Sequence, residues 1–369
     1  MKIRIKEYWN KLKAEYKNKY KEKIFKNYEQ TVPVFEKFRD FLNELLSKYP
    51  TDVDIICILA SVELELGYQE TAIKLLEDFI SKYKNTISDT DKARIYTNLG
   101  FYHEFGEKQG EYLLEAEKPN SPFVETYKGL ALTYFSNYEY NKITEDLYKS
   151  LKYFEKALKI TNDYEIYFGY AVCLFETKQY QKAKEIFEEL LLEYPNRMRL
   201  LLSISYCEAY LGNKEKAIHY LKQVKVDQDE NYYLTTDDIG EFEVFEVYYF
   251  LEEYDLFLKE CEKEIMRYYF ADWNHYFYTL WIKNENKKFN KYIEKYKNEM
   301  LEAIEEAKID DDFSDEKERQ DCIKSYEEDL EKLMTMSNKI KNGNYKPKIE
   351  LKLYPEYGCF LIECIRHNF

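Results

Sequence analysis

Between positions 164 and 231 the pattern of large, small and polar residues repeats with a period of 34 residues. Large positions match large ones and small match small: Tyr167, Ala171, Ala183 and Phe187 are followed by Leu201, Ser205, Ala217 and Leu221. Self-similarity at this period is typical of stacked helical arrays, in which each unit buries its apolar face against its neighbours. The pattern predicts an all-α solenoid with an extended surface instead of a closed pocket.

Residues 164–197 contain two runs of helical spacing. The apolar face of the first run holds Tyr167, Tyr170, Ala171 and Leu174, and that of the second holds Ala183, Phe187, Leu190 and Leu191. Such spacing places each set on one side of a helix. A polar turn at 178–180 joins the runs, and Pro195 ends the second. We expect two helices packed as an αα-hairpin.

This unit resembles a tetratricopeptide repeat. The family's large, small, aromatic and closing proline positions are held by Tyr167, Tyr170-Ala171, Leu174, Ala183, Phe187 and Pro195, with Leu190 in the second alanine position. The next unit, 198–231, keeps Leu201, Gly212 and Ala217 but has no closing proline. The resemblance implies a right-handed α-solenoid of helix-turn-helix pairs.

Weaker copies of the pattern extend the expected solenoid to residues 31–308. They lie at 54–83, 93–117 and 124–163, and helical pairs without a clear repeat follow residue 232. The copy at 124–163 is seven residues longer than the pattern. We assign the extra residues to a long turn at 136–148.

The N-terminal segment, residues 1–30, is basic and amphipathic. It holds ten Lys or Arg against four Glu, whereas the whole chain has a net charge of −15. Ile5, Trp9 and Leu12 follow helical spacing, which predicts a helix that caps the array while its lysines stay in solvent. Contact with an anionic surface is the alternative.

The C-terminal part departs from the helical pattern. Residues 309–343 comprise an acidic loop at 310–315 and a polar helix over 316–341, with Asn342-Gly343 as its C-cap. Within 344–369, Ile349, Leu351 and Leu353 alternate with polar residues, and a Pro-Gly turn precedes a second apolar run. This period of two predicts a small C-terminal β-hairpin. Its edge offers a route to self-association.

Composition and charge restrict the classes of function. The negative charge argues against nucleic acid as a partner, because affinity for phosphate backbones depends on Lys and Arg. No apolar run approaches the ~20 residues that span a bilayer, and the start resembles no secretory signal. Seven Cys without a Cys-x-x-Cys pair indicate reduced thiols. We expect a cytoplasmic protein without a transmembrane segment.

Motifs for catalysis, cofactors or metals were not found in the sequence. It has no His-Glu-x-x-His pattern and no glycine-rich phosphate loop. Cys359, Cys364 and His367 lie close along the chain. On a strand, however, residues 359 and 364 face opposite sides, which prevents a shared tetrahedral site. We therefore expect no enzyme, no cofactor and no metal.

The family resemblance implies a concave groove lined by fixed positions of the first helices. The residues at these positions are Thr97, Phe101, Lys128, Leu132, Phe135, Phe168, Val172, Phe175, Leu202 and Tyr206. The clamp by which this family holds a peptide's C-terminal carboxylate requires Lys and Asn at these positions. Only Lys128 fits, and its partner position holds Leu132. The predicted groove is therefore apolar and aromatic.

An apolar groove indicates a non-enzymatic scaffold or adaptor for a protein or peptide. The occupant can be an amphipathic helix or extended peptide from a partner, or the chain's own C-terminal segment. Two alternatives remain: a regulator that senses a peptide, and an acidic immunity or antitoxin protein that caps a basic partner.

Overall fold

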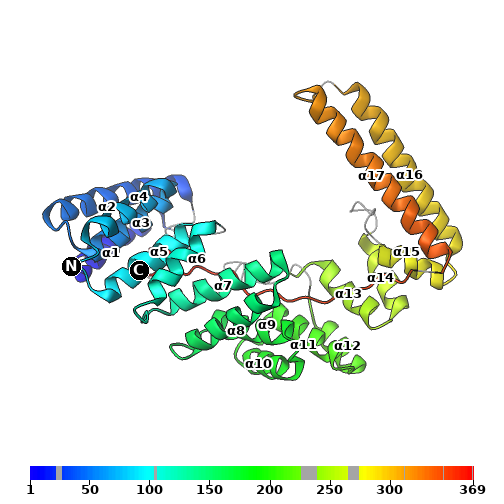
Figure 1. Cartoon of the computed structure of the whole chain (residues 1–369), viewed down its shortest axis with the longest axis horizontal. Coiled ribbons are helices and arrows are strands. Elements are labelled where there is room, and N and C mark those ends of the chain that lie inside the picture. The colour runs from blue at the N-terminus through cyan, green and yellow to red at the C-terminus, as the bar shows by residue number, and fades with distance from the viewer. Residues whose placement is uncertain are drawn as a thin grey trace. The chain divides into compact units, whose positions relative to one another are not determined.

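The computed structural model of the chain describes residues 1–21, 27–103, 106–225, 239–264, 274–310, 312–343, 345–367 and 369. The described residues form helices, turns and extended segments, without a strand among them (Figure 1). The chain folds into two compact units: unit 1 comprises residues 1–186 and 354–369, and unit 2 comprises 187–353. The prediction of an all-α fold is confirmed.

Unit 1 consists of consecutive helices that pack in pairs. Its helices are α1 (Lys2–Tyr20), α2 (Tyr28–Lys48), α3 (Val53–Glu65), α4 (Gln69–Tyr83), α5 (Asp89–Tyr102), α6 (Glu107–Glu117), α7 (Val124–Asn141), α8 (Thr144–Leu158), α9 (Tyr164–Glu176) and the start of α10 (Tyr180–Glu193). The pairs α3 with α4, α5 with α6 and α7 with α8 have extensive contacts. The helix pair predicted at 164–197 corresponds to α9 and α10.

Side-chain caps fix where several of these helices begin. Asn27 Oδ1 accepts from the Gln30 backbone N–H at 3.1 Å. Ser88 Oγ accepts in the same way from the N–H of Asp91 at 3.1 Å. Each cap satisfies a backbone donor that has no partner within its helix. The start of α2 and that of α5 therefore follow from local sequence.

The apolar stripe of α1 packs on α2. Ile5, Trp9 and Leu12 are buried in one cluster with Phe35 and Phe38. The Trp9 ring stacks on Phe38 at a centroid distance of 4.9 Å. Because this face is buried, most of the basic residues of α1 lie on the opposite, solvent-facing side, where their charged groups stay hydrated.

The prediction of a long turn at 136–148 is wrong. α7 continues to Asn141, Lys142 adopts a left-handed φ of 58°, and α8 begins at Thr144. The Lys142 N–H donates to Tyr138 O at 2.7 Å, which closes the last turn of α7. The extra residues therefore lengthen a helix, because the sequence there offers no proline or glycine that would end it.

Unit 2 continues the helical pairs and ends in a long helical hairpin. Its helices are α11 (Met198–Tyr210), α12 (Lys214–Leu221), α13 (Glu241–Phe250), α14 (Tyr254–Glu264), α15 (Asn274–Ile282), α16 (Asn286–Ile309) and α17 (Glu316–Lys341). α16 and α17 lie side by side (Figure 1). α17 has the predicted bounds, and Gly343 beyond it has a φ of 70°.

The prediction of a C-terminal β-hairpin is wrong. Residues 345–361 are extended without strand pairing, and turns follow from 362 onward. Backbone groups of this segment bond to side chains of helices instead of to a second strand, for example the Leu351 N–H to the Tyr210 hydroxyl at 3.1 Å. The hairpin edge suggested for self-association is therefore not present in the described residues.

Several predicted features lie outside the described residues. These are residues 22–26 of the N-terminal segment, 104–105 of the weak repeat, 226–231 of the second repeat, Asp311 of the acidic loop and Asn344. Within the described part of the chain, none of the helices has the length and apolar character that a bilayer crossing requires.

Candidate functional site

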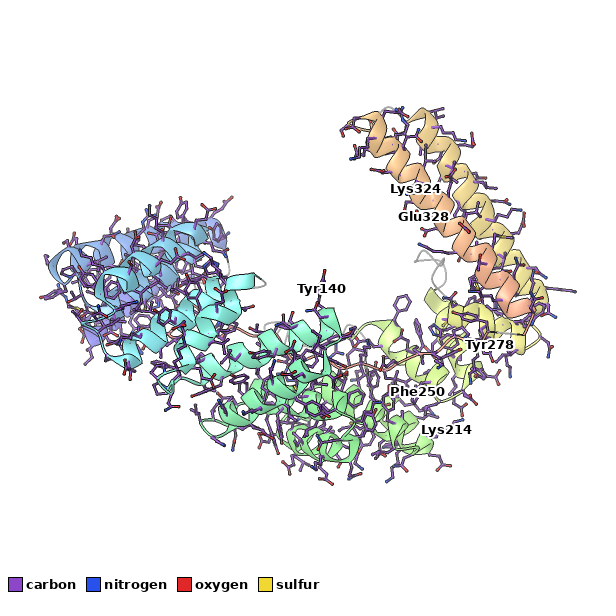
Figure 2. The ribbon with its side chains drawn as sticks, viewed as in Figure 1. Tyr140, Lys214, Phe250, Tyr278, Lys324 and Glu328 are labelled. Carbon is purple, nitrogen blue, oxygen red and sulfur yellow. The ribbon has the colours of Figure 1, made fainter. Side chains whose placement is uncertain are left out.

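The candidate site of unit 1 is the surface of α3, α5 and α7 that holds residues 354–369, called here the C-terminal segment. Its trace runs beside these helices in Figure 1. Phe360, Leu361 and Ile362 of the segment are buried. By contrast, Tyr140 near the end of α7 projects into solvent and is 89% exposed (Figure 2). The segment therefore occupies an inner surface of unit 1 and contributes to its core.

Polar side chains from three successive first helices bond to the backbone of the C-terminal segment. The contacts are Lys128 Nζ to Cys359 O at 3.2 Å, Ile362 N to Asn98 Oδ1 at 3.0 Å, and Ile365 N to Ser61 Oγ at 3.3 Å. Backbone groups are present in every peptide, so such contacts hold an extended chain whatever its side chains. Buried backbone donors also need these partners to avoid a desolvation penalty.

A large apolar side chain of the segment fits against a glycine of α7. Phe360 is 2% exposed, and its ring meets that of Phe101 edge-on at a centroid distance of 5.2 Å. A Cβ atom built on Gly129 would lie 2.9 Å from the Phe360 ring. Only glycine at position 129 leaves room for this ring in its present place.

An acidic side chain of the segment lies among cationic groups. The Glu363 carboxylate pairs with Arg94 of α5 and with Lys2 of α1. Arg94 also donates to Asp54 Oδ1 of α3 at 2.7 Å. Because Arg94 is 6% exposed, its charge needs these carboxylates to balance its desolvation.

Lys128 and Gly358 define the entrance of the C-terminal segment into this groove. Lys128 pairs with Glu165 of α9 in addition to its contact with the segment. A Cβ atom at Gly358 would lie 2.8 Å from Lys128 Nζ and 2.9 Å from Glu165 Cδ. The segment therefore passes close to this ion pair at a residue without a side chain.

The structure places the predicted groove residues in different surroundings. Nine are buried, namely Thr97, Lys128, Leu132, Phe135, Phe168, Val172, Phe175, Leu202 and Tyr206, and Phe101 is half-buried. Phe101 and Lys128 contact the C-terminal segment. The Thr97 hydroxyl instead pairs with that of Thr126 at 2.6 Å, between α5 and α7.

The aromatic residues predicted on α9 pack within the helical array. The ring of Phe168 stacks on that of Tyr164 at 5.7 Å, and the ring of Phe175 meets Tyr180 of α10 at 5.2 Å. Leu202 and Tyr206 belong to unit 2, where the Tyr206 hydroxyl donates to Glu243 O at 3.1 Å. These contacts join side chains within and between helices of the array.

Sequence reasoning missed Asn98, Arg94 and Gly129. Asn98 and Arg94 are buried polar residues on α5, whose other inward residues are mostly apolar or small. A buried polar side chain costs free energy unless it has a partner. Their position on the inner face of a helix was therefore a signal that another segment covers α5.

The expected separation of Cys359 and Cys364 is also wrong. The two sulfur atoms and a ring nitrogen of His367 all lie within 4.8 Å of one another. The chain turns at Ile362 and Glu363, where Glu363 has a φ of 58°, and so it returns Cys364 toward Cys359. Alternation along a strand does not apply to a chain that turns.

The Cys364 thiol differs from the other buried cysteines of unit 1, whereas the hydrogen bond to Cys364, and then burial, raise the pKa of the Cys359 thiol. Burial raises the pKa of the Cys57 thiol to about 11 and that of Cys173 to about 12. The hydrogen bond from Cys359, together with one from His367, lowers the pKa of the Cys364 thiol although burial opposes this. A thiolate is the form of cysteine that binds metals and reacts.

Unit 2 has its own contacts to the part of the chain just before the C-terminal segment. The Tyr249 hydroxyl donates to Pro347 O at 2.8 Å, and the Tyr210 hydroxyl to Leu351 O at 3.3 Å. His275 Nε2 lies 3.1 Å from Lys348 O, and burial lowers the pKa of this histidine. Side chains of helices again bond to the backbone of an extended segment.

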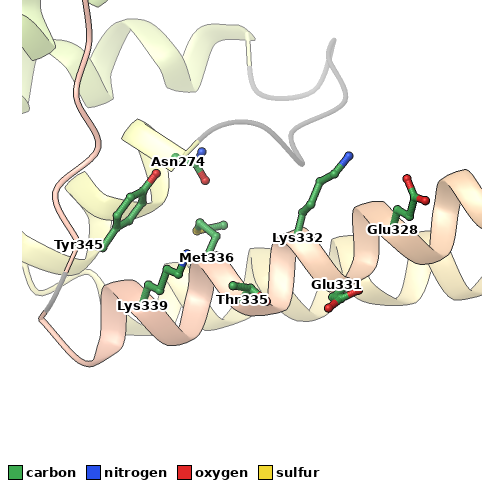
Figure 3. Close-up of a pocket in the computed structure, with 8 residues that line it drawn as sticks. All are labelled: Asn274, Glu328, Glu331, Lys332, Thr335, Met336, Lys339 and Tyr345. Carbon is green, nitrogen blue, oxygen red and sulfur yellow. The ribbon is translucent and has the colours of Figure 1, made fainter.

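A cavity of unit 2, of about 440 Å³, lies beside α17 (Figure 3). Its lining mixes charges of both signs and comprises Asn274, Glu328, Glu331, Lys332, Thr335, Met336, Lys339 and Tyr345. Charged groups of the lining are already in ion pairs: the Lys332 ammonium, for example, lies 2.9 Å from the Asp329 carboxylate. The cavity therefore presents no single charge or apolar surface to a ligand.

The sequence of residues 146–204 matches the tetratricopeptide repeat family. Residues 146–204 are therefore a tetratricopeptide repeat (TPR) region of this chain. The comparison with curated proteins gave no significant match.

Solved structures of low sequence identity resemble this TPR chain. YrrB, "a TPR protein with an unusual peptide-binding site", is 16% identical, with 50% of this chain and 90% of YrrB covered and a TM-score of 0.42. The apo form of RapI is 17% identical over 92% of this chain and 99% of RapI, with a TM-score of 0.46. Yeast Tom70 is 13% identical over 85% and 62%, with a TM-score of 0.38. These values are too low to transfer a ligand.

Proposed function

We propose that the chain is a non-enzymatic TPR module that binds an extended peptide in the groove of unit 1. The observation that carries this proposal is the set of backbone contacts from Ser61, Asn98 and Lys128 to the C-terminal segment. One such residue comes from each of α3, α5 and α7. This spacing suits a peptide that crosses successive repeats, and the side chains hold it without a reacting group.

The C-terminal segment also indicates the chemistry of the peptide. The groove receives a large apolar side chain at Phe360 and, three residues later, a carboxylate at Glu363. Apolar anchors in pockets and charge-assisted contacts are the usual sources of specificity in such complexes. We therefore propose a partner with a large apolar residue followed, three positions on, by Asp or Glu.

In this state the chain's own segment occupies the groove, which favours the peptide-sensing regulator among the alternatives. An external peptide must compete with the segment. Its apparent affinity equals its affinity for the open groove multiplied by the fraction of molecules whose groove is open. A partner that displaces the segment would expose it at the same time. Binding and release are thus coupled in one equilibrium.

The test uses the full chain and a labelled synthetic peptide with the sequence of residues 354–367. In the variant Phe360→Ala/Glu363→Ala the segment loses its anchor and its ion pairs, so the groove opens and we expect at least about tenfold tighter peptide binding than in the unmodified chain. Fluorescence anisotropy measures this binding. Tyr140→Ala, on an exposed side chain, serves as the matched control and should behave as the unmodified chain.

A third variant shows whether the peptide enters the proposed groove. Asn98→Ala, added to Phe360→Ala/Glu363→Ala, removes the acceptor for the Ile362 N–H and should weaken peptide binding by about tenfold. Circular dichroism checks that each variant keeps its helical content. The proposal fails if the folded double variant binds the peptide no better than the unmodified chain.

A further inference from the structure

Three metal-ligating side chains of the C-terminal segment converge at one point. Cys359 Sγ, Cys364 Sγ and a ring nitrogen of His367 lie within 4.8 Å of one another. Both cysteines are free thiols. Two thiols and an imidazole are soft and borderline donors, which suit metal ions such as Zn²⁺.

We propose that Cys359, Cys364 and His367 bind one zinc-class divalent metal ion. Two thiolates and one imidazole are among the donor sets that Zn²⁺ prefers. With Zn–S bonds of about 2.3 Å and Zn–N bonds of about 2.0 Å, a tetrahedral site needs ligand atoms about 3.5–3.8 Å apart. The three ligand atoms lie within 4.8 Å of one another, which exceeds the upper end of that range by about 1 Å at most.

The local backbone supports this site. The spacing Cys359-x4-Cys364 is within the range found for zinc-binding loops, and a turn joins Cys364 to His367 through a hydrogen bond from His367 N to Cys364 O at 3.2 Å. The Leu361 N–H points at Cys359 Sγ at 3.5 Å. Donors around sulfur stabilise the thiolate and orient it, as outer-shell partners of metal sites do.

The site has room for a fourth ligand. Cys364 is buried, Cys359 is half-buried and His367 is exposed. All three line a cavity of about 440 Å³ together with Glu65 and Arg366, which bond to each other at 2.6 Å. Because that pair is already satisfied, the chain supplies three ligands, and water or a donor from a partner takes the fourth position.

A bound metal would stabilise the docked state of the C-terminal segment. The ligands enclose Ile362, whose N–H bonds to Asn98, and Ile365, whose N–H bonds to Ser61. Closing this loop reduces the freedom that the segment gains on release. The metal site goes beyond the proposed peptide binding and does not depend on it.

The test uses the full chain, freed of metal and reduced with a phosphine that does not chelate. Titration with Co²⁺ should give one equivalent per chain, with thiolate-to-cobalt charge-transfer bands and the visible bands of a tetrahedral ion, and Zn²⁺ should displace it. Cys364→Ser should abolish these bands. His367→Ala should weaken binding by at least about 100-fold, because a direct ligand contributes more than the outer-shell partners whose loss costs about 10- to 100-fold.

Cys322→Ser on α17 is the matched control, because Cys322 is a partly exposed thiol in unit 2. It should bind Co²⁺ as the unmodified chain does. The proposal is overturned if the reduced chain gives no thiolate-to-cobalt band, or if the band persists in Cys364→Ser. Peptide binding by Phe360→Ala/Glu363→Ala in metal-free buffer tests the groove separately, so either proposal can fail alone.

Discussion

At the residue scale, the close contact between Phe360 and Gly129 is a tight constraint on what the groove can hold. The Phe360 ring lies where any side chain at position 129 would stand. Asn98 and Lys128 add polar contacts that do not depend on the peptide's side chains. Under the proposed function, the first contact would provide selectivity, and the other two would provide affinity for any peptide backbone.

A pair of glycine substitutions tests this contact. Gly129→Ala places a Cβ 2.9 Å from Phe360 and 3.0 Å from Leu113, so we expect a loss of about 1–3 kcal/mol in the free energy of unfolding. Gly110→Ala on α6 meets nothing closer than 3.7 Å and should instead gain up to about 1 kcal/mol from helix propensity. Denaturant unfolding of both variants measures the two signs. Equal effects would contradict the close approach of Phe360.

The sequence allowed prediction of part of this site. Lys128 and Phe101 were among the groove positions that the family resemblance implied, and both contact the C-terminal segment. The contacts of Asn98 with Ile362 and of Arg94 with Glu363 could not be predicted, because each joins residues at least 264 positions apart in the sequence. Contacts between distant segments are not encoded in a local pattern.

At the element scale, helical pairs were predictable and the C-terminal hairpin was not. The period of the apolar residues, proline at 195 and the cap at 342–343 determine helices locally. Leu351 and Leu353, whose alternation led to the wrong prediction of a hairpin, are both buried in an extended segment. The partner of its backbone is Tyr210, 141 positions away, which alternation cannot reveal.

α13 carries a carboxyl group whose titration changes the stability of unit 2. Burial, and then the charge of Glu243, raise the pKa of Glu246 from 4.5 to about 7. Because the folded pKa exceeds the unfolded value, the contribution to stability is complete below pH about 4.5 and is lost as the pH rises through 7. Glu246→Gln should therefore change stability little at pH 5 and increase it by up to about 3 kcal/mol at pH 8.

Melting curves at the two pH values measure this effect, with Glu252→Gln as the control. The hydrogen bond from Lys346 lowers the pKa of Glu252, so its contribution is present at high pH and is lost on acidification. That variant should lower the melting temperature at pH 8, opposite to Glu246→Gln. A pH-independent difference between Glu246→Gln and the unmodified chain would contradict the raised pKa.

At the scale of the whole molecule, each compact unit includes part of the extended C-terminal region. Unit 1 holds residues 354–369 through α3, α5 and α7, and unit 2 bonds to residues 347–351 through tyrosines and His275. A TPR array can leave its inner surface to a partner. Here the chain's own residues occupy that surface of unit 1, and the proposed function consists of exchanging them for a peptide.

Hydrogen exchange at the amides of Ile362 and Ile365 tests this occupancy most directly. Both N–H groups donate to side chains of unit 1, Asn98 and Ser61, so mass spectrometry of the full chain should show slow exchange across residues 360–366. Phe360→Ala/Glu363→Ala should speed this exchange while the amides of α5 stay protected. Exchange across 360–366 at the rate of a free peptide in the unmodified chain would contradict the account.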